Sequence, residues 1–333
     1  AVPFVIIVAG GFGETGADGA RREQDLRAIA NRFGTRILGP NSLGIFVPGE
    51  RLDTIFVEHG DKALGPGGGV AFITQSGSVG VEALGLASNA GYGMRAFVGL
   101  GNKCDLDELD FLEYFGRDAE TTCLAFYLEN IAHGRRFLES ARQVTPHKPV
   151  IVLKAGRTSS GARAVSSHTG RLAGMDAVVN GAFRQYGIQR VIDDEELCDA
   201  SKCLAMLPPA PGPRVAVLTP AGGFGVMGAD YIESDQRGIP LEMATLAPET
   251  VSRIRAVTFP FAACENPVDL TASADDGMFG RSLDALLDDD GVDIVICTAF
   301  FAPPAISDGL IREIADRATH SPKPVSDTHL RAH

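Results

Sequence analysis

The sequence contains an internal repeat, and this repeat constrains the fold more than any other feature. Residues 70–81 (VAFITQSGSVGV) match residues 215–226 (VAVLTPAGGFGV), and residues 102–106 (NKCDL) match residues 266–270 (NPVDL). In the first pair, an apolar run passes through a glycine-containing turn into a segment whose apolar residues have helical spacing. This pattern is typical of a strand–turn–helix unit. The sequence therefore predicts two copies of one α/β unit, 145 residues apart.

Short apolar runs alternate with amphipathic segments along the chain. The predicted strands are residues 4–8, 70–74, 96–98, 124–128, 150–153, 215–219 and 294–298. The predicted helices are residues 21–33, 79–90, 106–115, 135–144, 195–206 and 226–234. Continuous β-branched runs are typical of strands buried on both faces, as in a parallel sheet. The alternation therefore predicts a doubly wound α/β architecture.

Proline- and glycine-rich stretches mark two boundaries. Residues 208–213 (PPAPGP) are predicted to be a stiff linker between the two copies, and residues 64–69 mark an earlier boundary. A Lys-Pro-Val sequence occurs in both copies, and in the first copy the apolar residues that follow it complete a strand up to residue 154. In the second copy it is followed by residues 326–333 (SDTHLRAH), a mostly polar stretch that does not fit a buried strand. We therefore expect a non-native or disordered tail there. The sequence also begins inside an α/β unit. From these two features together, we expect a chain truncated at both ends.

Composition excludes several classes of protein. The net charge of −12 argues against a nucleic-acid surface, which needs a basic stripe. No apolar run approaches the roughly 20 residues of a membrane span. The six cysteines form no C-x-x-C pair, so a zinc finger is not expected. The sequence also lacks G-x-x-x-x-G-K-[ST], so ATP is not expected to bind through a P-loop.

His168 lies among small and hydroxyl residues in the stretch 166–170 (SSHTG), which is predicted to be a flexible loop. Neutral imidazole is a good nucleophile near pH 7, because its ordinary pKa lies close to that value. His168 is therefore a candidate nucleophile. The alternative is a surface histidine, or one that hydrogen-bonds a neighbouring loop.

Glu129 follows the apolar strand 124–128, at the strand's carboxyl end. Ligands bind at that edge in open α/β sheets. A carboxylate there can accept a hydrogen bond from one ring nitrogen of a histidine and leave the other nitrogen free to attack. The alternative is an ordinary acid at a strand end that caps the following helix.

Glycine-containing turns offer candidate sites for anions. Ser76, Gly77 and Ser78 join a strand to a helix, where backbone N–H groups and two hydroxyls could face a phosphate. A tight turn with only an N-cap is the alternative. Two N-terminal loops, residues 10–16 and 39–44, also follow strands and are suited to holding a nucleotide or a pantetheine chain.

Taken together and in order, these motifs resemble the NDP-forming acyl-CoA synthetases. That family includes the ADP-forming acetate–CoA ligases and has the α subunits of succinyl-CoA synthetase as relatives. The resemblance implies that His168 is the phosphorylated histidine and that Glu129 orients it. It also implies that Ser76, Gly77 and Ser78 form the phosphate-binding turn, at the helix N-terminus that receives the phosphoryl group.

The resemblance also implies a coenzyme A site. The residues it assigns to that site are Gly11, Phe12, Glu14, Pro40, Asn41 and Ser42. Ser42 stands where many relatives have cysteine, which argues against a thiol role at this position but not against binding. No metal ligands are implied within this chain.

The fold implied by the resemblance is a partial Rossmann-like CoA-binding domain followed by two flavodoxin-like doubly wound parallel-sheet domains. The expected partial domain covers residues 1–60, with its N-terminal half missing. The first flavodoxin-like domain, with the phosphohistidine loop, is expected over residues 66–207 and the second over residues 213–325. The expected tail covers residues 326–333.

The implied reaction is acyl-CoA + phosphate + ADP ⇌ acid + CoA + ATP, through acyl phosphate and a phosphohistidine. The cofactors are coenzyme A and ATP or ADP with Mg²⁺, the nucleotide being held by an ATP-grasp domain or β subunit outside this chain. The resemblance further implies a small carboxylic acid substrate and a cytoplasmic oligomer, without nucleic-acid or membrane partners. The alternative is a non-catalytic acyl-CoA-binding regulatory module of a fused acetyltransferase or sensor.

Overall fold

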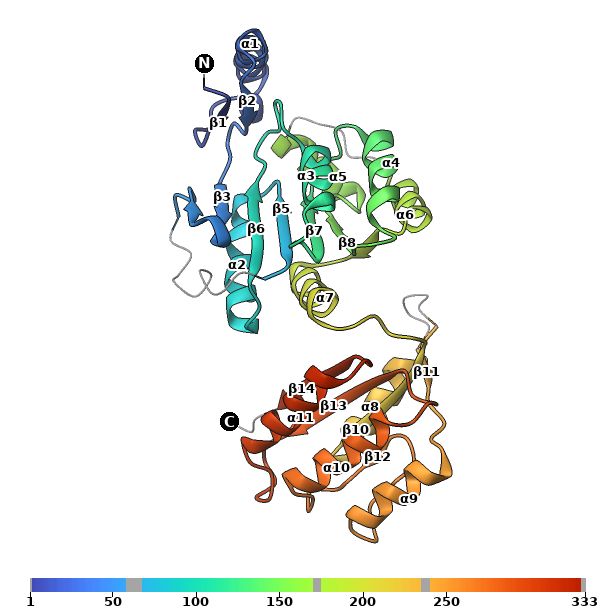
Figure 1. Cartoon of the computed structure of the whole chain (residues 1–333). Helices are drawn as coiled ribbons and strands as arrows, with labels where there is room; N and C mark the ends of the chain where they lie inside the picture. Colours follow the sequence, from blue (N-terminus) through green and yellow to red (C-terminus); the bar gives the residue numbers. More distant parts are fainter. Residues whose placement is uncertain (1, 58–67, 170–174, 235–239, 331–333) are drawn as a thin grey trace. The chain divides into compact units, whose positions relative to one another are not determined.

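The computed structural model describes residues 2–57, 68–169, 175–234 and 240–330 (Figure 1). The chain divides into two compact units, Ala1–Met206 and Leu207–His333. Each unit has its own sheet and its own apolar core. Both are α/β units with mainly parallel strands, so the predicted fold class is confirmed.

The first unit begins with a small β–α–β element. Strands β1 (Phe4–Ile6) and β2 (Arg36–Leu38) pair in parallel. The short 3-10 helix η1 (Gly13–Thr15) and helix α1 (Ala17–Phe33) connect them. Gly34 ends α1 with a φ of 67°, a left-handed conformation that favours glycine.

A seven-stranded sheet, in the order β4-β3-β6-β5-β7-β8-β9, forms the centre of the first unit. Its parallel strands are β5 (Val70–Thr74), β6 (Met94–Gly99), β7 (Cys123–Leu128), β8 (Val150–Lys154) and β9 (Gln189–Val191). Antiparallel strands β3 (Gly44–Val47) and β4 (Leu52–Asp53), joined by η2 (Pro48–Glu50), extend one edge. The sheet therefore continues across the boundary expected after residue 60.

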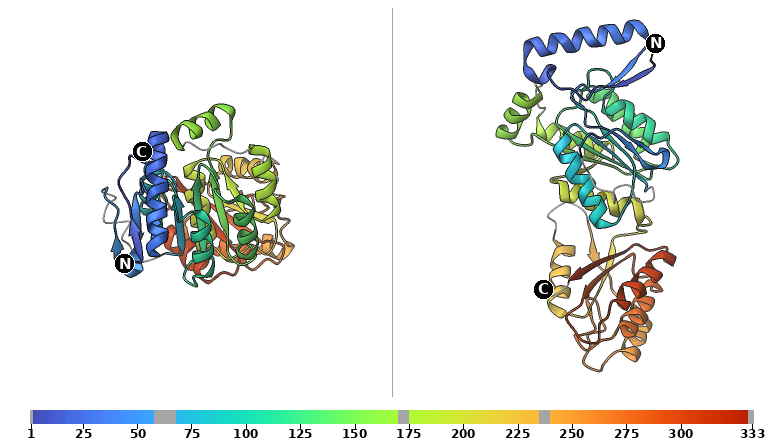
Figure 2. Two further views of the ribbon diagram at one scale, coloured as in Figure 1. Left: turned by 90° about the horizontal axis from the view of Figure 1, so that it is seen from above. Right: turned by 90° about the vertical axis from the view of Figure 1, so that its left-hand side faces the viewer.

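Helices cover both faces of this sheet. Helices α2 (Gly77–Ala90) and α7 (Asp194–Met206) lie side by side on one face (Figures 1 and 2), above a core that includes Phe72 and Phe97. Helices α3 (Glu108–Arg117) and α4 (Gly134–Val144) pack against the other face. Helices α5 (Ser159–Thr169) and α6 (Asp176–Gln185) lie between β8 and β9 in the chain. The central strands are buried on both faces, as the apolar runs predict.

The second unit repeats this plan with a sheet in the order β11-β10-β13-β14, and β12 pairs with β10. Its strands are β10 (Arg214–Thr219), β11 (Glu242–Met243), β12 (Val268–Asp269), β13 (Ile294–Phe300) and β14 (Val325–Leu330). Its helices are α8 (Gly222–Glu233), α9 (Pro248–Val257), α10 (Asp276–Leu287) and α11 (Gly309–His320). Both members of the predicted repeat are strand–turn–helix units, β5–α2 and β10–α8.

One prediction about the second unit is wrong in part. The sequence predicts a non-native or disordered tail over residues 326–333, yet residues 326–330 are ordered and form most of β14, which pairs in parallel with β13 from Val325 to Leu330. The reason is that β14 is an edge strand of its sheet, with β13 as its neighbour, and edge strands tolerate polar residues. Residues 331–333 lie outside the described part of the chain.

Candidate functional site at the carboxyl ends of the strands

The parallel strands of the first unit bring several predicted site residues to one edge of the sheet. Strands β5 and β7 are neighbours, with Thr74 opposite Tyr127, so Ser76 and Glu129 follow adjacent strand ends. Strand β8 pairs with β7 on the other side and ends at Lys154. The carboxyl edge of a parallel sheet is the usual place for a ligand. The fold therefore gathers the candidate phosphate turn and the candidate orienting acid.

The turn at Ser76 is a capped helix start. Ser76 Oγ accepts a hydrogen bond from Val79 N at 3.4 Å and lies 3.1 Å from Ser78 Oγ. The buried hydroxyl of Thr74 accepts from Ser76 N at 3.0 Å, so this amide is already bound within the fold. Gly77 and Ser78 are exposed in the first turn of α2, whose N–H groups have no acceptor within the helix. The turn thus offers an anion two amides and two hydroxyls.

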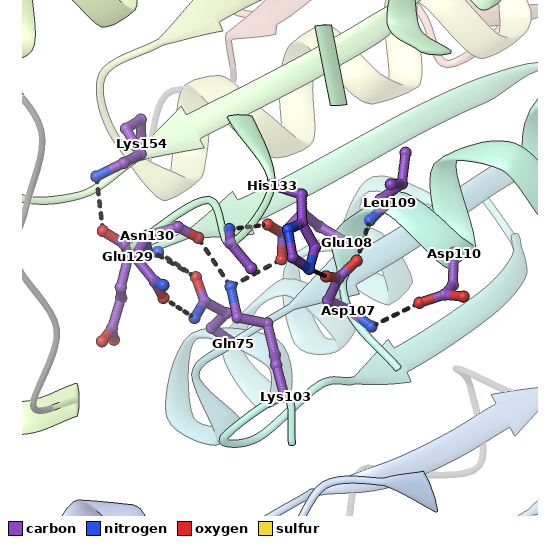
Figure 3. A network of polar contacts seen from close by, with 11 residues as sticks. Gln75, Lys103, Asp107, Glu108, Leu109, Asp110, Glu129, Asn130, His133 and Lys154 are labelled. Carbon is purple, nitrogen blue, oxygen red and sulfur yellow. Dashed lines mark hydrogen bonds and ion pairs between the residues drawn. The ribbon is translucent and has the colours of Figure 1, made fainter. Parts of the chain in front are cut away.

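Glu129 is buried, with 5% of its surface exposed. Its backbone is held from both neighbouring strand ends: Glu129 N donates to Gln75 Oε1 at 2.6 Å, and Lys154 Nζ donates to Glu129 O at 2.6 Å. Burial and the nearby Glu129 carboxylate raise the pKa of Tyr127 to about 12. Figure 3 shows the Glu129 carboxylate pointing away from Lys103, Glu108 and Asn130. The backbone of Glu129 is therefore held by Gln75 and Lys154, while its carboxylate points away from the other residues of this network.

His168 lies in the last turn of α5. The sequence predicts a flexible loop at this position, and that prediction is wrong for the backbone of residues 166–169. The physical reason is local: Thr158 Oγ1 accepts from Gly161 N at 3.1 Å and caps the helix start, and alanines at 162 and 164 favour the helix that follows. The side chains of residues 166–169, and all of residues 170–174, lie outside the described part of the chain.

A groove of about 520 Å³ opens at the same sheet edge. Its lining includes Val79 of α2, Tyr127 of β7, Lys154 of β8 and Arg157 before α5, together with Asp193. Burial lowers the pKa of the Lys154 ammonium. The groove therefore combines both signs of charge with apolar surface.

The N-terminal glycine loop is organised by Glu14. Its carboxylate accepts hydrogen bonds from the backbone N–H groups of Gly11 and Phe12, the latter at 3.1 Å. Asn102 Nδ2 also donates to Glu14 Oε2, at 2.5 Å. Burial opposes ionisation, but these hydrogen bonds outweigh it and lower the pKa of Glu14. The carboxylate therefore occupies amides that a phosphate would otherwise use.

The second N-terminal loop meets the first. Asn41 N donates to Ala9 O at 3.0 Å, and the side chain of Asn41 is exposed. Pro40 is buried, and its carbonyl accepts from Asn102 N at 2.8 Å. Ser42 is 1% exposed, donating to Gly99 O at 2.5 Å and accepting from Gly44 N at 3.0 Å. The Ser42 hydroxyl thus ties its loop to β6.

Sequence reasoning missed a group of polar residues beside these loops. They are Gln75, Asn102, Lys103, Glu108 and Asn130. Asn102 and Lys103 were noticed in the sequence as part of the repeat, without a role at the site. Their contacts join residues far apart in the chain, so neither spacing nor composition indicates them.

The described residues contain no group of three or more His, Cys, Asp or Glu side chains placed to hold a metal ion. Within the same ranges, no helix is long and apolar enough to cross a membrane.

Comparison with known proteins identifies the class. Residues 67–204 match the family model of the succinyl-CoA ligase like flavodoxin domain. The chain is 40% identical to the alpha subunit of acetate–CoA ligase [ADP-forming] II of Pyrococcus furiosus, over 97% of this chain and 70% of that subunit. It is 37% identical to the alpha subunit of isoform I from the same organism, over 96% of this chain and 68% of that subunit.

Solved structures agree with this class. The fold matches dinucleotide-forming acetyl-coenzyme A synthetase 1 of Candidatus Korarchaeum cryptofilum, in complex with phosphate and ADP, with a TM-score of 0.86 and 35% identity. That match covers 98% of this chain and 69% of the other. Fold and relatives define an acid–thiol ligase. The chain belongs to the family of ADP-forming acetate–CoA ligases, as the alpha-like portion of an ADP-forming acyl-CoA synthetase.

Proposed function

We propose that this chain carries a phosphoryl group on His168 during the reaction acyl-CoA + phosphate + ADP ⇌ acid + CoA + ATP. The observation that carries the proposal is the placement of Glu129 and the Ser76 turn on adjacent strand ends, linked by the hydrogen bond from Glu129 N to Gln75 Oε1 at 2.6 Å. A carboxylate and a phosphate-binding turn at one sheet edge are the two parts that a phosphohistidine needs.

In the proposed step, a neutral ring nitrogen of His168 attacks the phosphorus of an acyl phosphate. The new P–N bond forms as the P–O bond to the carboxylate breaks, and the free acid leaves as its anion. Glu129 accepts a hydrogen bond from the other ring nitrogen, which fixes the tautomer and offsets the positive charge that develops on the ring. The buried position of Glu129 supports this role, because a carboxylate acts more strongly on its partner away from water.

Ser76, Gly77 and Ser78 are proposed to hold the phosphoryl oxygens. The exposed amides of Gly77 and Ser78 lie at the positive end of α2, and the hydroxyls of Ser76 and Ser78 are 3.1 Å apart. These donors would replace water lost by the phosphate and stabilise charge in the transition state.

Coenzyme A is proposed to bind along the loops that contain Gly11, Phe12, Glu14 and Pro40–Ser42. The donor set fits the neutral pantetheine chain better than a phosphate, because the Glu14 carboxylate occupies the amides of Gly11 and Phe12. The exposed Asn41 amide can both donate to and accept from a pantetheine amide. The Ser42 hydroxyl would act indirectly, by keeping the loop on β6.

The remaining parts of the reaction are proposed to lie outside this chain. ATP or ADP with Mg²⁺ would bind to an ATP-grasp domain or beta subunit, which the alpha-subunit relatives support. The substrate would be a small carboxylic acid and the assembly an oligomer. Because the reaction draws on ADP and coenzyme A, we propose a cytoplasmic location.

The test is phosphorylation of the chain by γ-labelled ATP in complex with an ATP-grasp subunit. The expected result is acid-labile, base-stable label that is lost in His168→Asn. His147→Asn is the matched control. His147 is an exposed residue that precedes β8 in the chain, and it has no role in the proposal. Label that survives His168→Asn would overturn the assignment. Binding of acyl-CoA without any label would favour a non-catalytic acyl-CoA-binding module.

A further inference from the structure

The peptide that carries Glu129 is held almost entirely by side chains from other elements (Figure 3). Four residues do this, and we name them the Glu129 clamp: Gln75, Lys103, Glu108 and Lys154. They come from the turn after β5, the loop after β6, helix α3 and the end of β8. The clamp therefore includes residues from both neighbours of β7, which are β5 and β8, and from the β6–α3 segment.

Gln75 makes three hydrogen bonds to two consecutive residues. Its Oε1 accepts from Glu129 N at 2.6 Å and from Asn130 N at 3.0 Å, and its Nε2 donates to Asn130 Oδ1 at 2.8 Å. The backbone N of Gln75 also donates to Tyr127 O at 3.1 Å. One amide side chain thus fixes the direction in which the chain leaves β7.

Two buried lysines and a buried glutamate complete the clamp. Lys154, 4% exposed, donates to Glu129 O at 2.6 Å. Lys103 Nζ donates to Asn130 O at 2.8 Å and to Glu108 Oε2 at 2.7 Å, and Glu108 Oε1 accepts from Ala132 N at 2.6 Å. The Lys103 and Glu108 side chains are 0% and 1% exposed.

Burying these groups costs free energy, because charges lose hydration that an ion pair regains only in part. Apolar residues of similar volume would hold a loop against a sheet at lower cost. The clamp groups instead point at the peptide groups of residues 129–132, which implies that the exact path of this segment matters. Satisfied polar networks of this kind specify one arrangement more strictly than apolar packing does.

We propose that the Glu129 clamp consists of positioning residues, which hold the Glu129 carboxylate where it can orient His168. This inference rests on the proposed function, because it assigns the clamp no contact with substrate. The clamp acts through the backbone on either side of Glu129, so its effect on the reaction passes through Glu129 alone.

A double-mutant cycle tests this directly, with the rate of His168 phosphorylation by γ-labelled ATP and an ATP-grasp subunit as the measurement. Gln75→Leu removes all three clamp bonds of Gln75 but no atom of Glu129. Glu129→Gln keeps the backbone and removes the charge. We expect Glu129→Gln to lower the rate about 100-fold and Gln75→Leu about tenfold. In the Glu129→Gln background, Gln75→Leu should change the rate by less than about twofold, because coupled residues are not additive.

The pH profile separates positioning from simple loss of structure. A carboxylate beside an imidazole raises the imidazole pKa, so the rate falls on the acid side as His168 becomes protonated. Glu129→Gln should move this acid limb to lower pH, and Gln75→Leu should move it in the same direction. A purely structural role would lower the rate without moving the limb, and this result would overturn the proposal.

Two further variants complete the design. Lys154→Met removes the hydrogen bond to Glu129 O while nearly keeping the length of the side chain. If Gln75→Leu does not fold, Lys154→Met takes its place in the cycle, and we expect for it the rate loss and the shift of the acid limb given above for Gln75→Leu. Gln143→Leu, at an exposed position of α4, should leave rate and profile unchanged. Additive losses in the cycle would overturn the clamp but not the phosphohistidine. The proposed function itself fails if the unsubstituted chain takes no label or if His168→Asn keeps its label.

Discussion

Asn102 and Glu14 are 88 residues apart in the chain, yet the Asn102 side-chain amide donates to the Glu14 carboxylate at 2.5 Å. The same amide donates to Glu23 Oε2 at 3.0 Å. The neighbouring residue, Lys103, holds the peptide that follows Glu129. Two consecutive residues of one loop therefore contact the proposed coenzyme A segment on one side and the proposed phosphoryl-transfer segment on the other.

Asn102→Asp should destabilise the contact with the N-terminal loop. It replaces a donor to two carboxylates with a third negative charge, so attraction becomes repulsion. We expect a loss of about 1–3 kcal/mol in the free energy of unfolding at pH 7 and weaker coenzyme A binding. Urea unfolding and calorimetry measure these effects. Asn89→Asp, at an exposed position of α2, is the control, and an equal loss there would contradict this explanation.

Glu14→Gln should reduce stability in a pH-dependent way. The pKa of Glu14 is lowered in the folded protein, so its ionised form contributes stability above the ordinary carboxyl pKa. That contribution disappears as the pH falls through the lowered pKa. The free energies of unfolding of the two proteins should therefore differ at pH 7 and converge at the acid end. If the difference between the two free energies of unfolding instead grew on acidification, the pKa of Glu14 would not be lowered in the folded protein.

Gly80→Ala should destabilise the first unit. A Cβ at this position would lie 2.5 Å from Phe97 Cζ and 3.0 Å from Thr74 Cγ2, and both side chains are buried. Forcing extra volume into a packed core costs about 1–3 kcal/mol. Gly85 lies in the same helix with nothing within 4 Å of its Cβ position, so Gly85→Ala should instead stabilise by about 0.5–1 kcal/mol. Thermal unfolding of the two variants measures both changes in stability. If both variants were stabilised, or both destabilised, the packing described for α2 would be contradicted.

Asp293→Asn should weaken the second unit above about pH 4. Hydrogen bonds from Arg214, at 2.7 and 2.8 Å to the two carboxylate oxygens, lower the pKa of Asp293 to about 2. The stability contributed by the ionised group is present above the ordinary carboxyl pKa and lost as the pH falls towards 2. Hydrogen exchange of β10 should therefore be faster in the variant at pH 7. Asp316→Asn, at an exposed position, should leave it unchanged.

The regular elements of the fold could be predicted because their signals are local. The strand at residues 70–74 and the helix start after Ser76 follow from an apolar run and a capping serine, and both appear as β5 and α2. Strand β14 was missed because its polar residues are acceptable only at a sheet edge, and the sequence does not state which strand is outermost. The helix around His168 was missed because serine and glycine suggested a loop, whereas the cap at Thr158 starts a helix.

The candidate site could be predicted only in part. Glu129 and Ser76 follow apolar strands, and parallel strand ends meet at one edge, so their proximity was accessible from the sequence. The contacts of Lys103 with Glu108 and Asn130 depend on how three loops pack, and no local pattern encodes them. The same holds for Glu14, whose role in closing its own loop appears only once Asn102 is placed beside it.

The most direct measurement is the mass of the tryptic peptide 164–171 (AVSSHTGR) after the chain has been phosphorylated by ATP and an ATP-grasp subunit. The account predicts one phosphate on His168, lost after brief acid treatment and retained in base. Phosphate on Ser166 or Ser167 that survives acid, or an unmodified peptide beside a label elsewhere in the chain, would contradict it.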